Sequence, residues 1–326
     1  MTHPRIAIIG AGSLSGAQIY PRIAKAGAKL AAVCDLDENK AKARTALYGG
    51  KVYTDMDKML AEEPLDGVMV CVGPGFHPVG AQKVMKAGLP VYTEKPAAES
   101  SAEVLDILRV QRETGQLYMC AFKKRYADGY RRAKEFIDSP AFGQPSMLSM
   151  FKSFRPYLNT SLRRDFLLDF CVHGIDLATY LFGNVDEVYA YSPEKNTYVA
   201  TLKYVNGAAG TLSFCGHRPN RMEEVVEITG EDSYMTLWDS SAWRAYTHGE
   251  ISEVKDANFA TAGGNGGNTS GHQSEIDTFI QAIQGKAEIV SDAEACFHSM
   301  LLYEAIRDSA ASDKVVKIDN SIPEIE

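Results

Sequence analysis

Short apolar runs alternate with helical patterns through the first 122 residues of this 326-residue chain. Few polar residues interrupt the apolar runs, which lie at 5–10, 29–34, 67–72, 90–93 and 118–122. Helical patterns separate these runs at 13–25, 38–48, 55–62, 77–87 and 100–114. Such runs are typical of strands that are buried on both faces of a parallel sheet. The sequence therefore predicts an α/β domain with a doubly wound parallel sheet over residues 1–122.

Individual residues mark where these helices begin or bend. Asp55 and either Ser100 or Ser101 lie where helical patterns begin and are expected N-caps, because their side-chain oxygens can accept hydrogen bonds from free backbone amides. Pro21 falls inside the first helical pattern, and its missing N–H predicts a kink there.

Consecutive hairpins are expected after residue 122. Strand-like runs lie at 146–154, 185–191, 197–204, 208–215, 223–229, 233–238 and 242–247, and helical patterns at 127–138, 169–182, 273–285 and 293–311. Asn206 and Gly207 together are a strong signal for a two-residue hairpin turn. We therefore predict an α+β domain with an open, mostly antiparallel sheet over residues 123–326. The glycine-rich stretch 257–271 predicts a mobile loop.

Charge balance and cysteine spacing argue against several classes of protein. Acidic residues outnumber basic ones by 42 to 34, and the net charge of -8 argues against a nucleic-acid partner. The six cysteines form no C-x-x-C pair, so we expect neither a metal site nor a redox motif. Three of them lie in apolar runs, which fits a reducing compartment. The sequence shows neither a signal peptide nor a membrane-length apolar run, so we expect a cytoplasmic protein with no membrane partner.

A glycine loop follows the first apolar run and opens a helix. Backbone amides in such a loop can bind a dinucleotide pyrophosphate, and glycine leaves room for its close approach. The expected cofactor contacts in the loop are Gly10, Gly12, Ser13, Leu14 and Ser15. An ordinary glycine turn between strand and helix would leave the same pattern.

Asp35 ends the second apolar run, about 20 residues beyond the glycines. A carboxylate at this place accepts hydrogen bonds from the adenosine ribose hydroxyls and repels a 2′-phosphate. Asp35 therefore favours NAD over NADP. The alternative is that Asp35 caps the following helix, a role that Asp37 could equally fill.

Lys95 follows the run at 90–93 in the sequence Glu94-Lys95-Pro96. Ligands bind beyond the carboxyl ends of strands in open α/β sheets, so Lys95 is placed to face a cofactor and substrate. The alternative is an ordinary surface lysine on a loop.

Asp169, His173 and Asp176 have the spacing i, i+4 and i+7, so they would share one face of an otherwise apolar helix. Histidine near a carboxylate suits proton transfer at neutral pH. The alternative is a buried histidine that only makes a structural hydrogen bond, with Asp169 as a helix cap.

Together these motifs resemble the glucose–fructose oxidoreductase, inositol dehydrogenase and MocA (Gfo/Idh/MocA) family over essentially the whole chain. The matching stretches are G-A-G-S-L-S-G at 10–16, V-C-D at 33–35, the segment from Pro74 to His77, E-K-P at 94–96 and L-D-x-x-x-H-x-x-D at 168–176. The resemblance implies a Rossmann domain followed by a substrate domain, and an active site lined by Lys95, Asp169 and His173. It also implies further cofactor contacts from Gly73, Pro74, His77, Glu94 and Lys95. Members of the family commonly form dimers or tetramers through the sheet of the second domain.

The chain also departs from the family pattern. Ser15 stands where a third glycine is usual, and Gly73 stands where threonine is common. Several basic residues lie where substrate contacts are expected, and they suit a carboxylate or phosphate group on the substrate. The candidate substrate-binding residues are Lys123, Arg125, Arg155, Arg164, Asp169 and His173. A solvated basic loop would explain the two later arginines equally well.

The resemblance predicts hydride transfer between a secondary alcohol of a sugar or polyol and NAD, with Lys95 or His173 moving the proton. Two alternatives stay open at this point. One is an NAD-dependent glycoside hydrolase that oxidises its sugar transiently, which needs the same lysine and histidine. The other is a dinucleotide sensor without catalytic activity.

Overall fold

The computed structural model describes residues 3–154, 165–218, 222–256 and 270–324, and the chain divides into two compact units. The first unit holds residues 1–123 and 272–297, and the second holds 124–271 and 298–326. The sequence places a single division between residues 122 and 123. The return of 272–297 to the first unit was not expected, and packing of a later helix against the parallel sheet explains it.

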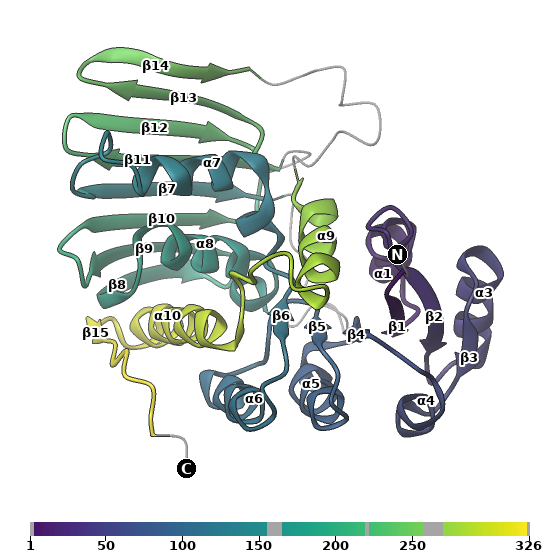
Figure 1. Cartoon of the computed structure of the whole chain (residues 1–326). Coiled ribbons are helices and arrows are strands. Elements are labelled where there is room, and N and C mark those ends of the chain that lie inside the picture. Colours follow the sequence, from purple (N-terminus) through teal and green to yellow (C-terminus); the bar gives the residue numbers. More distant parts are fainter. Residues whose placement is uncertain (1–2, 155–164, 219–221, 257–269, 325–326) are drawn as a thin grey trace. The chain divides into compact units, whose positions relative to one another are not determined.

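Six parallel strands form the sheet of the first unit, in the order β3-β2-β1-β4-β5-β6 (Figure 1). The strands are β1 (Arg5–Ile9), β2 (Lys29–Cys34), β3 (Lys51–Tyr53), β4 (Gly67–Val70), β5 (Val91–Thr93) and β6 (Tyr118–Cys120). The doubly wound sheet is confirmed. Sequence analysis missed β3, which has three residues and lies at the edge of the sheet.

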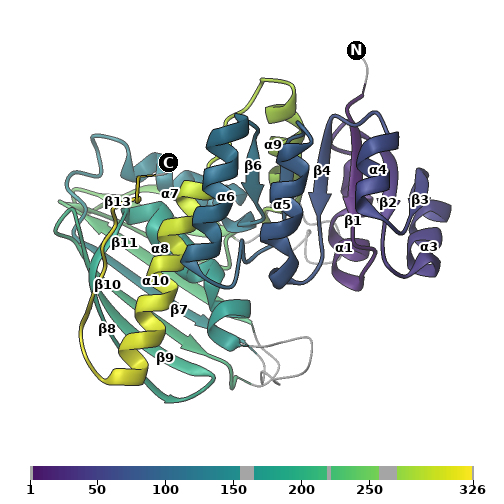
Figure 2. The ribbon, with the colours of Figure 1, turned by 90° about the horizontal axis from the view of Figure 1, so that it is seen from below.

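Helices cover both faces of this sheet, with α5 and α6 side by side on one face and α1 and α9 on the other (Figures 1 and 2). The helices are α1 (Ser13–Gln18), α2 (Tyr20–Ile23), α3 (Glu38–Tyr48), α4 (Met56–Glu62), α5 (His77–Lys86), α6 (Ser101–Thr114) and α9 (His272–Ile283). Pro21 lies at the beginning of α2, and the expected kink is a break between α1 and α2. Asp55 and Ser100 are the N-caps of α4 and α6.

Helix α9 belongs to the first unit because its apolar side packs on the parallel sheet. The ring of Phe279 lies 5.8 Å from the ring of Tyr92 on β5. A Cβ on Gly67, at the beginning of β4, would come within 2.7 Å of the Ile283 side chain. A side chain at this position would thus meet the end of the Ile283 side chain, which would have to shift to admit it.

The second unit contains a mixed, mostly antiparallel sheet of nine strands, in the order β14-β13-β12-β11-β7-β10-β9-β8-β15. The strands are β7 (Met147–Ser153), β8 (Val185–Glu194), β9 (Thr197–Tyr204), β10 (Ala209–Cys215), β11 (Glu223–Gly230), β12 (Ser233–Trp238), β13 (Ala242–Thr247), β14 (Glu250–Lys255) and β15 (Val316–Lys317). Neighbouring strands are antiparallel except for β7 and β10, which run parallel. The expected hairpin at Asn206 and Gly207 joins β9 to β10, and β14 and β15 were not expected.

Helices α7 (Asp128–Ile137), α8 (Val172–Phe182) and α10 (Ala293–Ser312) accompany this sheet. Along β11 every second residue is buried, which is the alternation of a strand with only one face in the core. The helix expected at 169–182 begins differently, because residues Leu167–Cys171 form a π-helical turn before α8.

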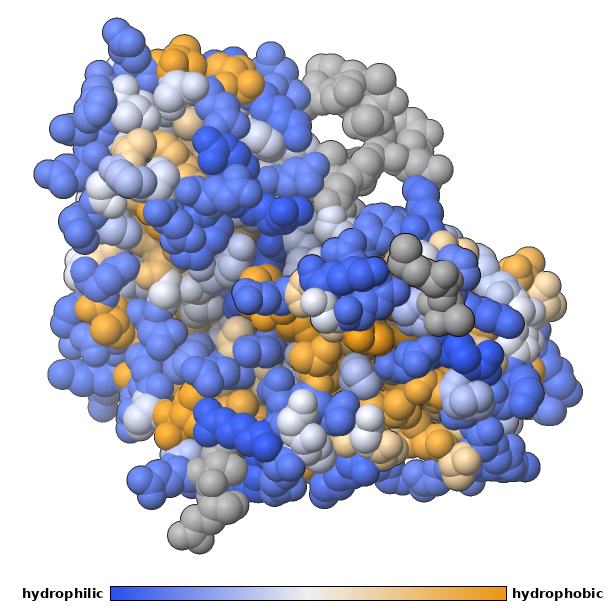
Figure 3. Space-filling view, in the orientation of Figure 1, coloured by the Kyte–Doolittle hydropathy of each residue, from blue (hydrophilic) through white to orange (hydrophobic). Residues whose placement is uncertain are grey.

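On the face drawn in Figure 3, hydrophilic side chains cover most of the surface and hydrophobic side chains gather in smaller areas. Within the described part of the chain, no helix combines the length and apolar character needed to cross a membrane.

Candidate active site

The glycine loop of the first unit leaves space for a phosphate-bearing ligand. Gly10 has a φ of +104°, and a Cβ on it would lie 2.2 Å from the carbonyl oxygen of Cys71. Gly12 is the N-cap of α1 without a side-chain cap, and a Cβ on it would meet nothing within 4 Å. Ser13 and Leu14 are exposed beside it. The loop thus fits the backbone-amide cradle that a dinucleotide pyrophosphate requires.

Ser15 compensates for the missing third glycine of the loop. Its side chain is buried, and its hydroxyl donates to the carbonyl oxygens of Gly10 and Gly12 at 3.1 and 3.2 Å. Arg44 donates to the Gly12 carbonyl at 2.9 Å and occupies the space where a Cβ on Gly16 would lie. The buried Ser15 hydroxyl therefore stabilises the glycine loop. Because Gly16 has no side chain, the Arg44 guanidinium can pack against its backbone.

Asp35 lies at the end of β2 and contacts the glycine loop. One carboxylate oxygen accepts from the Ala11 amide at 2.7 Å, and the other accepts from the Asp37 amide at 2.9 Å. Asp37, and not Asp35, caps α3 by accepting from the amides of Asn39 and Lys40. Asp35 is consequently held beside the loop, with carboxylate lone pairs left for the hydroxyls of a ribose.

Lys95 follows β5 at the carboxyl end of the parallel sheet. The Glu94 amide donates to the Val70 carbonyl at 2.9 Å, and the Lys95 amide donates to a Glu94 carboxylate oxygen at 3.2 Å. The Lys95–Pro96 peptide is cis. These bonds fix the backbone of Lys95 between the ends of β4 and β5.

The other expected cofactor contacts lie near this backbone. Gly73 is exposed and precedes the short 3-10 helix Pro74–Phe76, and His77 is buried at the beginning of α5. Burial lowers the pKa of the His77 imidazole, and the Lys95 charge adds to that effect.

Acidic and basic side chains gather at the same end of the sheet. Desolvation raises the pKa of the Glu94 carboxyl, although the Lys95 charge opposes it. The Lys123 ammonium lies 3.3 Å from the ring nitrogen Nε2 of His272. Burial and the Lys123 charge lower the His272 pKa to about 3, so this ring is neutral at physiological pH. Lys123, expected to bind substrate, thus lies beside a histidine that sequence analysis did not select.

In the second unit, the π-helical turn carries Asp169 and leads directly into α8 with His173. Both side chains are partly exposed, whereas Asp176, the third residue of the expected face, is completely buried. A π-helical turn adds one residue to a turn of helix and often marks a functional site. Asp169 and His173 therefore differ from Asp176 in what they can contact.

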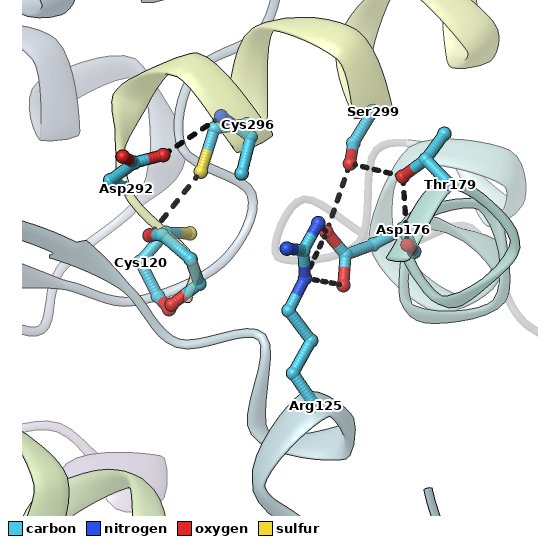
Figure 4. Close-up of polar contacts among 9 residues, drawn as sticks. Cys120, Arg125, Asp176, Thr179, Asp292, Cys296 and Ser299 are labelled. Carbon is cyan, nitrogen blue, oxygen red and sulfur yellow. Dashed lines mark hydrogen bonds and ion pairs between the residues drawn. The ribbon is translucent and has the colours of Figure 1, made fainter. Parts of the chain in front are cut away.

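Arg125 binds Asp176 in the interior of the second unit, as Figure 4 shows. The guanidinium and the carboxylate share two hydrogen bonds, at 2.9 Å from Nε and 2.8 Å from Nη2. Ser299 donates to the same carboxylate at 2.9 Å. Burial raises the pKa of Asp176, and the Arg125 charge opposes that rise. This arrangement gives Arg125 a structural ion pair beside its expected role in substrate binding.

Sequence analysis also missed Lys152 and Glu224, which lie close together near the π-helical turn. Lys152 on β7 donates to the Phe170 carbonyl at 3.3 Å, and its ammonium lies 3.6 Å from Glu224. Both side chains are buried where their strands face the core. The signal was present in the sequence, because each charged residue occupies a core-facing position of an alternating strand. Arg155 and Arg164 lie outside the described residues.

Among the described residues, no cluster of histidine, cysteine or acidic side chains could hold a metal ion.

Comparison with known families then decides what the glycine loop binds. A model of the oxidoreductase family with an NAD-binding Rossmann fold matches residues 4–122, and a model of its C-terminal alpha/beta domain matches residues 115–318. The chain belongs to the Gfo/Idh/MocA oxidoreductase family. Its first unit contains the NAD-binding Rossmann domain of that family, and NAD is its cofactor.

Curated relatives of this Gfo/Idh/MocA chain include inositol 2-dehydrogenases. That of Leifsonia xyli is 29% identical over 197 residues, which are 59% of this chain and 58% of the relative. That of Rhizobium meliloti is 21% identical over 336 aligned residues, which cover 96% of this chain and 99% of the relative. The first of these alignments thus spans little more than half of the relative's length.

Solved structures share the fold over nearly the whole Gfo/Idh/MocA chain. An Agrobacterium radiobacter oxidoreductase in complex with NAD+, L-tartaric acid and magnesium has a TM-score of 0.85 at 18% identity, covering 97% of this chain and 98% of that one. The WlbA dehydrogenase of Bordetella pertussis, in complex with NADH and UDP-GlcNAcA, has a TM-score of 0.81 at 22% identity, covering 98% and 99%.

Proposed function

We propose that this protein transfers a hydride between NAD and a secondary alcohol of a sugar, polyol or sugar derivative. Family membership supports the reaction class. The inositol 2-dehydrogenases among the relatives support a polyol substrate. Neighbours solved with L-tartaric acid and with UDP-GlcNAcA support substrates that are rich in hydroxyl groups. When bound, NAD supplies the acceptor for the hydride that leaves the alcohol carbon.

The observation that carries the proposal is the π-helical turn of the second unit. It presents a carboxylate, Asp169, directly before a helix whose first turn carries a partly exposed histidine, His173. An alcohol gives up its hydride readily only when its hydroxyl proton also leaves, and histidine is the usual side chain for that transfer near neutral pH. The turn therefore supplies the proton chemistry that a dehydrogenase needs.

In this proposal, three side chains have different roles in the reaction. The Lys95 ammonium stabilises the negative charge that develops on the substrate oxygen. Either His173 or Lys95 takes the hydroxyl proton, and Asp169 hydrogen-bonds a neighbouring substrate hydroxyl. Lys123 and Arg125, with Arg155 and Arg164 outside the described residues, are proposed to contact the rest of the substrate.

The preference for NAD over NADP is a separate part of the proposal. The Asp35 carboxylate is held against the glycine loop by the amides of Ala11 and Asp37. A 2′-phosphate on the ribose would bring a second negative charge to this carboxylate, and like charges at contact distance are unfavourable. We therefore expect Asp35→Ser to improve the use of NADP and to weaken the use of NAD.

A substrate screen tests the function directly. NADH formation is followed by absorbance with purified protein and a panel of inositols, free sugars, sugar acids and sugar phosphates, with NADP run in parallel. We expect NAD-dependent turnover with at least one polyol or sugar, and weaker turnover with NADP. NAD binding without turnover across the panel would contradict the proposal. Cleavage of a nitrophenyl glycoside without net NADH formation would instead identify a glycoside hydrolase.

A further inference from the structure

We propose that His77 is the positioning residue for Lys95, because it holds the backbone carbonyl that follows this lysine. The inference rests on the proposed function, in which Lys95 acts on the substrate oxygen. It assigns a positioning role to a buried histidine that does not itself take part in the proposed reaction.

His77 is placed between two loops that meet at the carboxyl end of the parallel sheet. It is the first residue of α5, and its side chain has 0% exposure. Its Nδ1 lies 2.7 Å from the carbonyl oxygen of Pro96, and its Nε2 lies 3.1 Å from the carbonyl oxygen of Val72. One imidazole ring therefore lies between the loop after β5 and the loop after β4.

The chemistry of the two contacts identifies the donor. Carbonyl oxygens only accept hydrogen bonds, and a neutral imidazole has a single N–H to donate. Burial and the Lys95 charge lower the His77 pKa and keep the ring neutral. The shorter contact, to Pro96, therefore marks Nδ1 as the nitrogen that carries the proton.

The bond to Pro96 completes the support of the Lys95 backbone. On the N-terminal side, the Glu94 amide is bound to Val70 and the Lys95 amide is bound to the Glu94 carboxylate. On the C-terminal side, His77 holds the next carbonyl. A lysine must be held within a fraction of an ångström to stabilise a developing charge, and a misplacement of about 1 Å can cost on the order of 100-fold in rate.

Two isosteric substitutions separate the two contacts of the ring. The amide nitrogen of asparagine can occupy the place of Nδ1, and that of glutamine the place of Nε2. His77→Asn keeps a donor to Pro96, so we expect its kcat within about threefold of wild type. His77→Gln loses this donor, and we expect its kcat to fall by about 10- to 100-fold. Equal loss in both variants, or greater loss in His77→Asn, would overturn the assignment.

Hydrogen–deuterium exchange provides a readout that needs no substrate. We expect the amides of Glu94, Lys95 and Ala97 to exchange faster in His77→Gln than in wild type, and at the wild-type rate in His77→Asn. The segment 197–204 of the second unit is the internal control and should not change. Wild-type exchange of Glu94, Lys95 and Ala97 in both variants would overturn the proposal. Because this result does not depend on turnover, it remains decisive even if the substrate screen finds no activity.

Nitrogen-15 NMR of labelled histidines tests the same claim on the unmodified protein, with a variant needed only to assign the signal. The chain has 7 histidines, and the His77 signal is the one lost in the His77→Asn spectrum. We expect the Nδ1–H tautomer with a neutral ring. An Nε2–H tautomer would contradict the proposed bond to Pro96.

Discussion

Glu275 in the first unit and Glu224 in the second are almost completely buried, and their surroundings have opposite effects on their charge. Glu275 on α9 is 1% exposed and Glu224 on β11 is 5% exposed. Burial alone disfavours the charged form of both. Their different partners therefore decide which of them is a carboxylate at neutral pH.

Glu224 is compensated by two lysines. The Lys124 ammonium and the Tyr130 hydroxyl both donate to one carboxylate oxygen, and Lys152 lies 3.6 Å from the other. Burial would raise the pKa of Glu224, but these lysine charges lower it to about 2. Glu224 is thus an anion that holds two buried cations in place.

Glu275 has no comparable compensation. Burial raises the pKa of its carboxyl well above the usual value, and the nearby Glu94 charge raises it further. The Lys123 and Arg22 charges oppose this rise in the pKa without reversing it. In the second unit, the buried charge of Glu224 thus helps to hold neighbouring strands together. The first unit keeps a carboxyl with a raised pKa near Glu94, beside the loop that carries Lys95.

The largest expected effect comes from removing the charge of Glu224. Glu224→Gln leaves Lys124 and Lys152 buried against a neutral amide, which should lower the free energy of unfolding by about 3–5 kcal/mol. Chemical denaturation at neutral pH measures the change. Glu250→Gln, on the exposed strand β14, is the matched control and should change it by less than about 0.5 kcal/mol. A small effect of Glu224→Gln would mean that the lysines do not depend on this carboxylate.

A double-mutant cycle tests the interaction between Lys124 and Glu224 directly, and its expected effect on the free energy of unfolding is smaller. Lys124→Met combined with Glu224→Gln should cost less than the sum of the two single changes, by about 1–3 kcal/mol, because the lysine and the glutamate interact directly. Denaturation of the four proteins under identical conditions gives the coupling. Additive costs would contradict the direct interaction.

Glu275→Gln should raise the free energy of unfolding, and by less than Glu224→Gln lowers it. In the folded state the raised pKa keeps the proton on Glu275 when the unfolded chain has already lost it. Wild-type stability therefore falls as pH rises from the unfolded pKa of about 4.3 toward the folded pKa, with a limiting slope of about 1.4 kcal/mol per pH unit. Glutamine does not titrate, so the variant should gain stability relative to wild type across this range.

Denaturation curves at several pH values measure that difference. Glu224 provides the internal contrast, because its lowered pKa makes its contribution present above about pH 4.3 and lost as pH falls toward about 2. If the stability of Glu275→Gln relative to wild type instead falls as pH rises, Glu275 is ionised in the folded protein.

Much of the fold was accessible from the sequence because it depends on local patterns. Continuous apolar runs predicted β1, β2, β4, β5 and β6, and the break at Pro21 and the caps at Asp55 and Ser100 follow from single residues. The position of α9 in the first unit could not be predicted in this way. It depends on packing between Phe279 and Tyr92, which are far apart in the chain.

The candidate site shows the same division between local and long-range information. The glycine loop, Lys95 and the pair of Asp169 and His173 are visible as motifs. The π-helical turn leaves no mark in the spacing of apolar residues, so the regular helical spacing expected of Asp169 relative to His173 was overestimated. The bond of Arg125 to Asp176 joins residues 51 positions apart, and only the fold reveals it.

The central proposal is that Lys95 and His173 are both needed for an NAD-linked oxidation of an alcohol. Steady-state turnover of Lys95→Met and His173→Ala, with NAD affinity measured by calorimetry, tests it most directly. The controls are the exposed residues in Lys86→Met and His217→Ala. We predict that both site variants lose about 100- to 10,000-fold in kcat while NAD affinity and the controls stay near wild type. Wild-type turnover in either site variant would contradict the claim.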